Sequence, residues 1–446
     1  MRCRHQIDPV TLQLQFKGFA YQSWSNSAYA DPASAQSLDD MVQTHANAIA
    51  LGDDYFVDTY KSNTIYADPV RTESLADLGI AIDEAHQRGL TVLVKPLVDS
   101  KDFAWRGFFQ PSDPAAFFQS YKSMIVAEAE VAEAHHAELF SIGCEMDQLT
   151  GSAYASYWDD IIAAVRSVYH GKLTYAAEWF NPAAVSFWSK LDYAGVDGYV
   201  PLSHNPDPSV AELVHAWRHA SSDPTVAQYF GTTSPIQFFE HFAASVGKPL
   251  IFTELGYGSN SNAAANPAGF SGRYSSDPTL QANLYQAFFK AWNSEEHSAL
   301  KGVFLWDWNT FPDGPNAGDA SWAGGFTPQG KPAETVITEW FEAGSHLFTF
   351  NRPVTRHHIR HIAAYAPGID GPFRLAHSIF QILPEGHLAA KHFVLGPAHN
   401  PDEFISYRPT TGALVFDNNG SLPGHAIELA MLPQHLHLTQ FDFFVY

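Results

Sequence analysis

Eight short apolar runs alternate with helix-like stretches between residue 16 and about residue 345, and this alternation constrains the fold more than any other feature. The runs are too short for helices and are typical of buried parallel strands. Strand, helix and strand in succession imply right-handed parallel crossovers, and eight such units close most simply into a (β/α)8 barrel. The predicted strands are 16–23, 48–57, 91–98, 139–146, 172–179, 193–201, 249–255 and 301–308.

Helical spacing fills the stretches between the strands, and Ser112 and Asp277, which stand shortly before prolines, predict two of the helix starts. The clearest helices are expected over 72–88, 114–136, 153–169 and 279–296.

The chain of 446 residues is longer than the roughly 250 residues of a typical barrel. We therefore expect an α/β barrel domain over residues 1–345 and a small β-rich module over residues 346–446. In the module, short apolar pieces alternate with Gly, Pro, Asn and His, and residues 411–420 are typical of a strand followed by an Asn-Gly turn.

Composition excludes several classes of protein. A net charge of −22 argues against binding to nucleic acid or to an anionic membrane surface. No run of about 18 apolar residues is present, and the first residues lack the apolar core of a signal peptide. Cys3 and Cys144 are the only cysteines, so no structural disulfide is predicted.

Two of the predicted strands end in a glutamate. Residues 139–147, Leu-Phe-Ser-Ile-Gly-Cys-Glu-Met-Asp, deliver Glu145, and residues 249–257, Pro-Leu-Ile-Phe-Thr-Glu-Leu-Gly-Tyr, deliver Glu254. Because the active sites of such barrels are built at the carboxyl ends of the strands, we expect these two carboxyl groups to converge.

Carboxylates and indoles dominate the predicted rim, and this combination of side chains is typical of a site that binds sugars. Trp306 and Trp308 alternate in orientation on one strand, so we expect Trp306 to face the pocket and Trp308 to pack beneath a helix. The residues predicted at the rim are Trp24, Asp58, Asp99, Glu145, Glu178, Trp179, Tyr199, Glu254, Trp306, Asp307 and Trp308.

Four segments carry a resemblance to glycoside hydrolase family 113 over about residues 16–345. They are Ser-Ile-Gly-Cys-Glu-Met, Phe-Thr-Glu-Leu-Gly-Tyr, Val-Lys-Pro-Leu-Val-Asp-Ser-Lys-Asp-Phe-Ala-Trp-Arg-Gly and Leu-Asp-Tyr-Ala-Gly-Val-Asp-Gly-Tyr-Val-Pro-Leu. The resemblance implies a retaining β-glycosidase, endo-acting on a β-1,4-mannan-like polysaccharide, with Glu145 as acid/base and Glu254 as nucleophile. It implies a sugar pocket shaped by Lys95, Asp99, Trp105, Arg106, Tyr199 and Trp306.

Retention requires two carboxyl groups about 5 to 5.5 Å apart, whereas inversion, the alternative, requires about 6.5 to 9.5 Å. Glu254 would be ionised, and Glu145 would be kept neutral by the charge of its partner and by aromatic walls. This chemistry requires no metal or organic cofactor.

Three positions depart from the wider pattern of such enzymes. Cys144 stands where an Asn is common, Leu97 where an imidazole is expected and Glu178 where an amide is expected. An added carboxylate suits an amino-sugar glycan or a bacterial exopolysaccharide, so a hydrolase of such a polymer is an alternative. A glycan-binding protein without catalysis is another. Trp105 and Trp179 either stack on sugars or pack within loops, and Glu178 either contacts substrate or pairs with an Arg.

His357, His358 and His361 have a spacing that a metal could use on a helix, but no carboxylate or Cys partner accompanies them at fixed spacing. We predict no metal site there.

The segment from Ala389 to Tyr446 resembles the C-terminal flank of repeats-in-toxin (RTX) proteins. This resemblance implies export by type I secretion machinery through the C-terminus and an extracellular location, with the cytoplasm as the alternative. The Gly-rich calcium repeats of such proteins are absent from the sequence.

Overall fold

The structure is a computed structural model in which the chain forms two compact units, Met1–Phe341 and Glu342–Tyr446. The boundary between the units, expected after residue 345, falls a few residues earlier, between Phe341 and Glu342 and within helix α10 (Pro332–Ser345). The described residues are 12, 14–269, 274–293, 299–311, 325–345, 349–350, 359–362, 365, 367 and 372–446.

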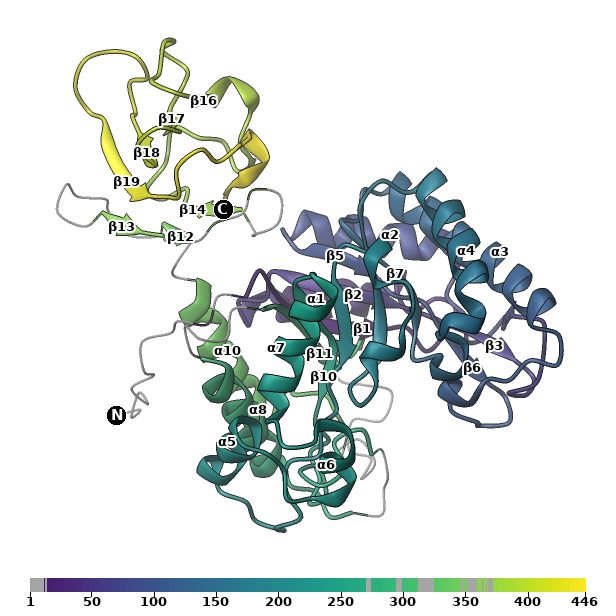
Figure 1. Cartoon of the computed structure of the whole chain (residues 1–446). Coiled ribbons are helices and arrows are strands. Elements are labelled where there is room, and N and C mark those ends of the chain that lie inside the picture. The colour runs from purple at the N-terminus through teal and green to yellow at the C-terminus, as the bar shows by residue number, and fades with distance from the viewer. Residues whose placement is uncertain are drawn as a thin grey trace. The chain divides into compact units, whose positions relative to one another are not determined.

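Unit 1 is built on a closed barrel whose neighbouring strands are all parallel, as predicted (Figure 1). The strand order around the barrel follows the order along the chain, and β11 returns to pair with β1. Every predicted strand is confirmed. The barrel strands are β1 (Phe16–Gln22), β2 (Ala48–Gly52), β5 (Thr91–Val94), β7 (Leu139–Cys144), β8 (Lys172–Glu178), β9 (Ala194–Asp197), β10 (Leu250–Gly256) and β11 (Leu300–Trp306).

Helices surround this barrel, and from α1 to α8 all except α4 begin at a capping residue whose side chain accepts a backbone hydrogen bond. Asp277 caps α8 as predicted, whereas α3 is capped by Asp113 and not by Ser112. The helix expected over 279–296 ends at Trp292. The remaining helices of unit 1 are α1 (Pro32–Gln43), α2 (Leu75–Gln87), α3 (Pro114–Ala134), α4 (Ala155–Val168), α5 (Val210–Arg218), α6 (Pro224–Phe230), α7 (Pro235–Val246) and α8 (Pro278–Trp292).

The strands predicted over 48–57 and 91–98 are each broken near the rim of the barrel. Each continues as a second strand that leaves the barrel, and β3 (Asp54–Val57), β4 (Tyr66–Ala67) and β6 (Leu97–Ser100) form a separate small sheet. Asp58 therefore follows β3 and not a barrel strand, and its carboxylate accepts a hydrogen bond from Tyr66 Oη at 2.7 Å. The prediction of Asp58 at the barrel rim was wrong for this reason.

The barrel interior changes character along its axis. Its lower layer is apolar and includes Phe16, Leu93, Leu139, Ile251 and Phe304. Above it lies a smaller group made of Leu97, Cys144 and Ala176, against which Trp306 packs. The charged side chains of the site lie next to this apolar group, at the carboxyl ends of the strands. The helices pack against the outside of the barrel and form a second, larger core with it.

Unit 2 is β-rich and has a core of its own, in which Phe373, Leu414 and Phe443 are fully buried. Strand β18 pairs antiparallel with β17 on one side and with β19 on the other. A turn follows β18, so the strand and turn predicted within residues 411–420 are confirmed. The strands are β12 (Thr349–Phe350), β13 (Arg360–His361), β14 (Phe373–Leu375), β15 (Gly386–His387), β16 (Phe393–Leu395), β17 (Ile405–Arg408), β18 (Ala413–Phe416), β19 (Ile427–Met431) and β20 (Phe443–Val445).

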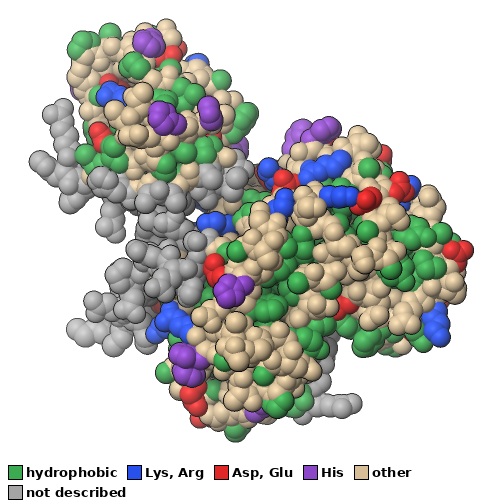
Figure 2. Space-filling model, viewed as in Figure 1, with side chains coloured by type: hydrophobic (Ala, Val, Ile, Leu, Met, Phe, Trp, Pro, Cys, Tyr) green, Lys and Arg blue, Asp and Glu red, His purple; other side chains and the backbone are tan. Residues whose placement is uncertain are grey.

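Charged side chains of both signs are interspersed on the face of unit 1 drawn in Figure 2. Across the described part of the chain, no helix combines the length and apolarity needed to cross a bilayer. Cys144 is a buried free thiol, and Cys3 lies outside the described residues. His361 lies in a strand, while His357 and His358 fall outside the described residues.

Candidate active site

Glu145 is placed by an irregular end of strand β7. The pairing of β7 with β8 shifts register between Ser141 and Cys144, and such shifts re-aim the side chains that follow them. Glu145 then adopts φ +50°, a left-handed conformation that costs a residue with a Cβ roughly 1 to 2 kcal/mol. Its N–H donates to the Ala176 carbonyl at 2.8 Å, which holds this conformation. The carboxylate is 6% exposed.

Glu254 is placed in the same manner by strand β10, whose register against β9 shifts between Phe252 and Glu254. Lys95 Nζ donates to its Oε1 in a buried ion pair, and Tyr199 Oη donates to its Oε2 at 2.6 Å. Donors on both oxygens favour the carboxylate form and fix its orientation. Sequence analysis placed all three residues in the pocket, and the structure brings them into direct contact.

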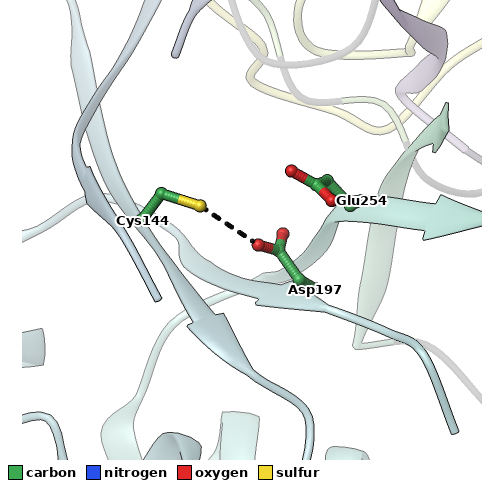
Figure 3. Close-up of side chains that lie close together, drawn as sticks. All are labelled: Cys144, Asp197 and Glu254. Carbon is green, nitrogen blue, oxygen red and sulfur yellow. Dashed lines mark hydrogen bonds between the residues drawn. The ribbon is translucent and has the colours of Figure 1, made fainter. Parts of the chain in front are cut away.

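Cys144, Asp197 and Glu254 converge from strands β7, β9 and β10, and their sulfur and oxygen atoms lie within 4.8 Å of one another (Figure 3). The Cys144 thiol donates to Asp197 Oδ2 at 3.4 Å, and Thr253 Oγ1 donates to Asp197 Oδ1 at 2.7 Å. Because Cys144 directly precedes Glu145, this contact places the two glutamates at the same end of the barrel.

Burial raises the pKa of the Cys144 thiol, which therefore stays protonated at neutral pH. Burial, and next the charge of Glu254, also raise the pKa of Asp197. A thiol and two carboxyl groups could coordinate a metal ion, but the Lys95 ammonium already supplies a cation to Glu254. Burial disfavours the charge of Lys95, yet Cys144, Glu254 and Asp197 together raise its pKa above the ordinary value.

Glu145 faces two donors on a single oxygen. Trp105 Nε1 and Arg106 Nη1 each donate to Glu145 Oε2 at 3.0 Å, and Arg106 also bridges to Asp99 at 2.6 Å. Burial alone would raise the pKa of Glu145, but Arg106, Glu178 and Trp105 outweigh it and hold this pKa below its usual range. The expectation that Glu145 is held neutral was therefore wrong for the free site. The aromatic residue beside it, Trp105, donates an N–H to its carboxylate, and the positive charge of Arg106 stabilises the ionised form.

Glu178 ends strand β8 and is hydrogen-bonded to Glu145 through their side chains. Burial, and next the negative charge of Glu145, raise the pKa of Glu178 well above its usual value. Its partner is thus a second carboxyl group and not the Arg that we considered from the sequence.

Two tryptophans mark the side of the site near Lys95. The Lys95 ammonium lies 5.9 Å from the centre of the Trp306 ring, and Trp24, which is 48% exposed, meets Trp306 edge to face. Trp308 is buried and its Nε1 donates to the Ser37 carbonyl of α1 at 3.1 Å. The expected division of roles between Trp306 and Trp308 agrees with these contacts.

A second aromatic cluster lies beside Glu145. Trp105 approaches Phe180 at 6.4 Å between ring centres, and Phe180 approaches Tyr229 of helix α6 at 5.0 Å. Trp179 is nearly buried and meets Phe180 and Tyr229 edge to face, so it supports this cluster from below. Tyr229 itself is 42% exposed.

Three residues of this arrangement escaped prediction. Phe180 and Tyr229 carry no motif, and helix α6 lies in a long connection whose path the sequence does not specify. Asp197 ends β9 in the segment Gly-Val-Asp-Gly, and its place at a strand end was a signal that could have identified it.

A closed (β/α)8 barrel with two buried glutamates, cations and exposed indoles at one end defines a glycoside hydrolase. The sequence profile of Glycoside Hydrolase Family 113 matches residues 18–331. The chain belongs to this family, and its substrate is a carbohydrate.

Solved structures agree with this assignment. The GH113 beta-mannanase AaManA from Alicyclobacillus acidocaldarius, in complex with ManMIm, is 25% identical, with a TM-score of 0.63 over 76% of this chain and 100% of that one. Two structures of a GH113 beta-1,4-mannanase, one of them a complex, are also 25% identical and give TM-scores of 0.61 and 0.62 over 74% of this chain and 99% of theirs. Among curated proteins, none matches the chain significantly.

Proposed function

We propose that this hydrolase cleaves β-1,4-linked mannan internally and with retention of anomeric configuration, by way of a covalent glycosyl-enzyme. The observation that carries the proposal is the pair of strand-end glutamates at one end of the barrel, where Lys95 and Tyr199 hold Glu254 as a carboxylate. Glu254 acts as the nucleophile on the anomeric carbon, and Glu145 exchanges the proton of the leaving oxygen. The similarity to β-1,4-mannanases supports mannan as the polymer.

Internal cleavage is supported by aromatic side chains next to both glutamates. Trp24 and Trp306 lie near Lys95, the partner of Glu254, while Trp105 contacts Glu145 directly. Aromatic rings stack on the apolar faces of sugars, so an arrangement of this kind binds sugar units on both sides of the bond that breaks.

The decisive experiment uses β-1,4-mannohexaose, with β-glucan and chitosan oligomers as comparison substrates. We expect cleavage of mannohexaose at internal bonds, and NMR of the first product should show the β-anomer. An α-anomer would instead indicate inversion. A preference for chitosan oligomers would support the amino-sugar alternative.

Glu145→Ala and Glu254→Ala separate the two roles. Both should lose nearly all activity on mannohexaose. Azide should restore turnover of an activated aryl β-mannoside by the Glu145 variant with formation of a β-azide, because azide replaces the water that Glu145 activates. Failure of azide to do so would contradict the acid/base role of Glu145.

A further inference from the structure

The free site poses a difficulty for acid catalysis, because Glu145 must give a proton to the leaving oxygen in the first step. Arg106 and Trp105 both donate to its Oε2, and both interactions favour the ionised form. A proton therefore has to reach Glu145 from a neighbouring group.

Glu178 is placed to supply that proton. Strands β7 and β8 are neighbours in the barrel, and the Glu145 backbone N–H bonds to Ala176, two residues before Glu178. The two side chains are hydrogen-bonded to each other, and they are 6% and 8% exposed. A carboxyl group can donate such a bond only when it is protonated, since a carboxylate is an acceptor alone. This contact therefore contains one proton.

The charges around the pair determine which carboxyl group keeps the proton at rest. Arg106 lies against Glu145, and among the described residues no Lys or Arg forms an ion pair with Glu178. Burial, and next the negative charge of Glu145, favour the protonated form of Glu178. The resting arrangement is thus protonated Glu178 that donates to ionised Glu145.

We propose that Glu178 is a positioning residue for acid and base catalysis: it shares one proton with Glu145 and passes this proton to Glu145, which delivers it to the glycosidic oxygen. The inference rests on the proposed function, in which Glu145 is the acid/base.

Protons and charges balance over both steps. In the first step, Glu254 bonds to the anomeric carbon and the bond to the leaving oxygen breaks, while the proton of Glu178 passes to Glu145 and from Glu145 to the leaving oxygen. The negative charge lost by Glu254 now resides on Glu178. In the second step, water gives a proton to Glu145 and its oxygen bonds to the anomeric carbon, while the bond to Glu254 breaks. The proton returns to Glu178.

Glu178→Gln in the full chain tests this role, since an amide can donate a hydrogen bond to Glu145 but cannot release a proton to it. We expect kcat/KM for mannohexaose to fall by about 10- to 100-fold, within the range of general acid effects. For 2,4-dinitrophenyl β-mannoside, whose leaving group needs no proton, kcat/KM should change by less than about 3-fold. An equal loss on both substrates would overturn the proposal.

The pH profile supplies a readout that a structural role would not move. In the variant, the amide stabilises ionised Glu145, so the loss of kcat/KM at basic pH should set in at lower pH than in the wild type. Glu178→Asp should restore part of the profile. Asp147→Asn is the matched control: burial and the charge of Glu145 raise the pKa of Asp147 to about 7, so this variant removes a nearby carboxyl group without replacing the proton donor. Its substrate ratio should match that of the wild type. An unshifted profile in Glu178→Gln would contradict the shared proton.

Infrared difference spectroscopy decides the question without any activity. Subtraction of the Glu178→Gln spectrum from the wild-type spectrum at pH 7 should reveal the loss of a protonated carboxyl band. Loss of a carboxylate band instead would show that Glu178 is ionised and would overturn the proposal. If Glu145→Ala keeps its activity on mannohexaose, the proposed function fails, and the infrared result still reports on the proton.

Discussion

At the scale of single residues, the chemistry of the site depends on the hydrogen-bond partners of each carboxyl group. Glu254 receives donors on both oxygens from Lys95 and Tyr199, whereas Glu145 receives two donors on one oxygen and a carboxyl partner in Glu178. The same side-chain type thus has different partners at the two positions, and only Glu145 has a carboxyl neighbour with which it can exchange a proton.

Removal of the Tyr199 hydroxyl should weaken the nucleophile specifically. The Oη to Oε2 bond of 2.6 Å is charge-assisted, and such bonds are worth about 1.5 to 3 kcal/mol. We expect Tyr199→Phe to lower kcat/KM for mannohexaose by about 10- to 100-fold with little change in melting temperature.

Tyr66→Phe is the matched control, because the Tyr66 hydroxyl donates to Asp58 outside the barrel rim. Its activity should equal that of the wild type. Wild-type rates in Tyr199→Phe would show that the contact with Glu254 does not matter for the reaction.

At the scale of elements, two features lie outside the regular barrel. Helix α6 lies in the connection between β9 and α7, and it carries Tyr229 to the aromatic cluster beside Glu145. Strands β3 and β6 leave the barrel and form a sheet against which α3 packs, since Tyr55 Oη of β3 donates to Glu128 of α3 at 2.6 Å.

Tyr229 joins, through Phe180, the aromatic cluster of Trp105, which donates to Glu145, so we expect it on the leaving-group side of the bond. We expect Tyr229→Ala to lower kcat/KM for mannohexaose by about 5- to 10-fold, as expected for the loss of one aromatic contact of roughly 1 kcal/mol. Hydrolysis of an aryl β-mannoside, which has no sugar on that side, should stay within about 2-fold. Equal losses on both substrates would contradict the assignment.

Glu128 makes the stability of unit 1 depend on pH. Burial raises its pKa to about 7, although the bond from Tyr55 acts in the opposite direction. A carboxyl group with a raised folded pKa stabilises the fold fully below its unfolded pKa of about 4.3, and this stability is lost as pH rises through about 7. Melting temperature should therefore fall across this window.

Glu128→Gln should flatten that fall by the equivalent of about 3 kcal/mol, because the amide does not ionise. Thermal unfolding followed by circular dichroism between pH 4 and pH 8 measures the slope. Glu130→Gln, at an exposed position of the same helix, should leave the slope unchanged. A slope in Glu128→Gln equal to that of the wild type would refute the role of Glu128.

At the scale of the whole molecule, the chain divides into two units with separate cores, and every residue of the candidate site belongs to unit 1. We therefore expect unit 1 alone to hydrolyse soluble oligosaccharides. Export through the C-terminus remains a prediction, and fusion of residues 389–446 to a reporter in a Gram-negative host with type I secretion machinery would test it.

Residues 1–345, expressed without unit 2, should retain kcat/KM for mannohexaose within about 2-fold of the full chain. The reason is that the cores are separate, so unfolding of one unit leaves the packing of the other intact. A loss above about 10-fold, with the barrel still folded by circular dichroism, would show that unit 2 contributes to catalysis.

The sequence by itself determined the barrel and the pair of strand-end glutamates, because apolar runs of strand length recur between helices and two of them end in glutamate. The resemblance to the family also implied that Lys95 and Tyr199 belong to the sugar pocket, without their contacts with Glu254. These features are local or repeat with a fixed period, so they can be read along the chain.

Only the tertiary structure decided the protonation of the site and which residues contact Glu145. The proton affinity of a buried carboxyl group depends on every charge and donor within a few ångströms, and these come from β5, β8 and the segment that carries Trp105 and Arg106. Tyr229 lies on helix α6, which no sequence motif predicts. Such relations arise from packing between distant segments, which periodicity along the chain does not record.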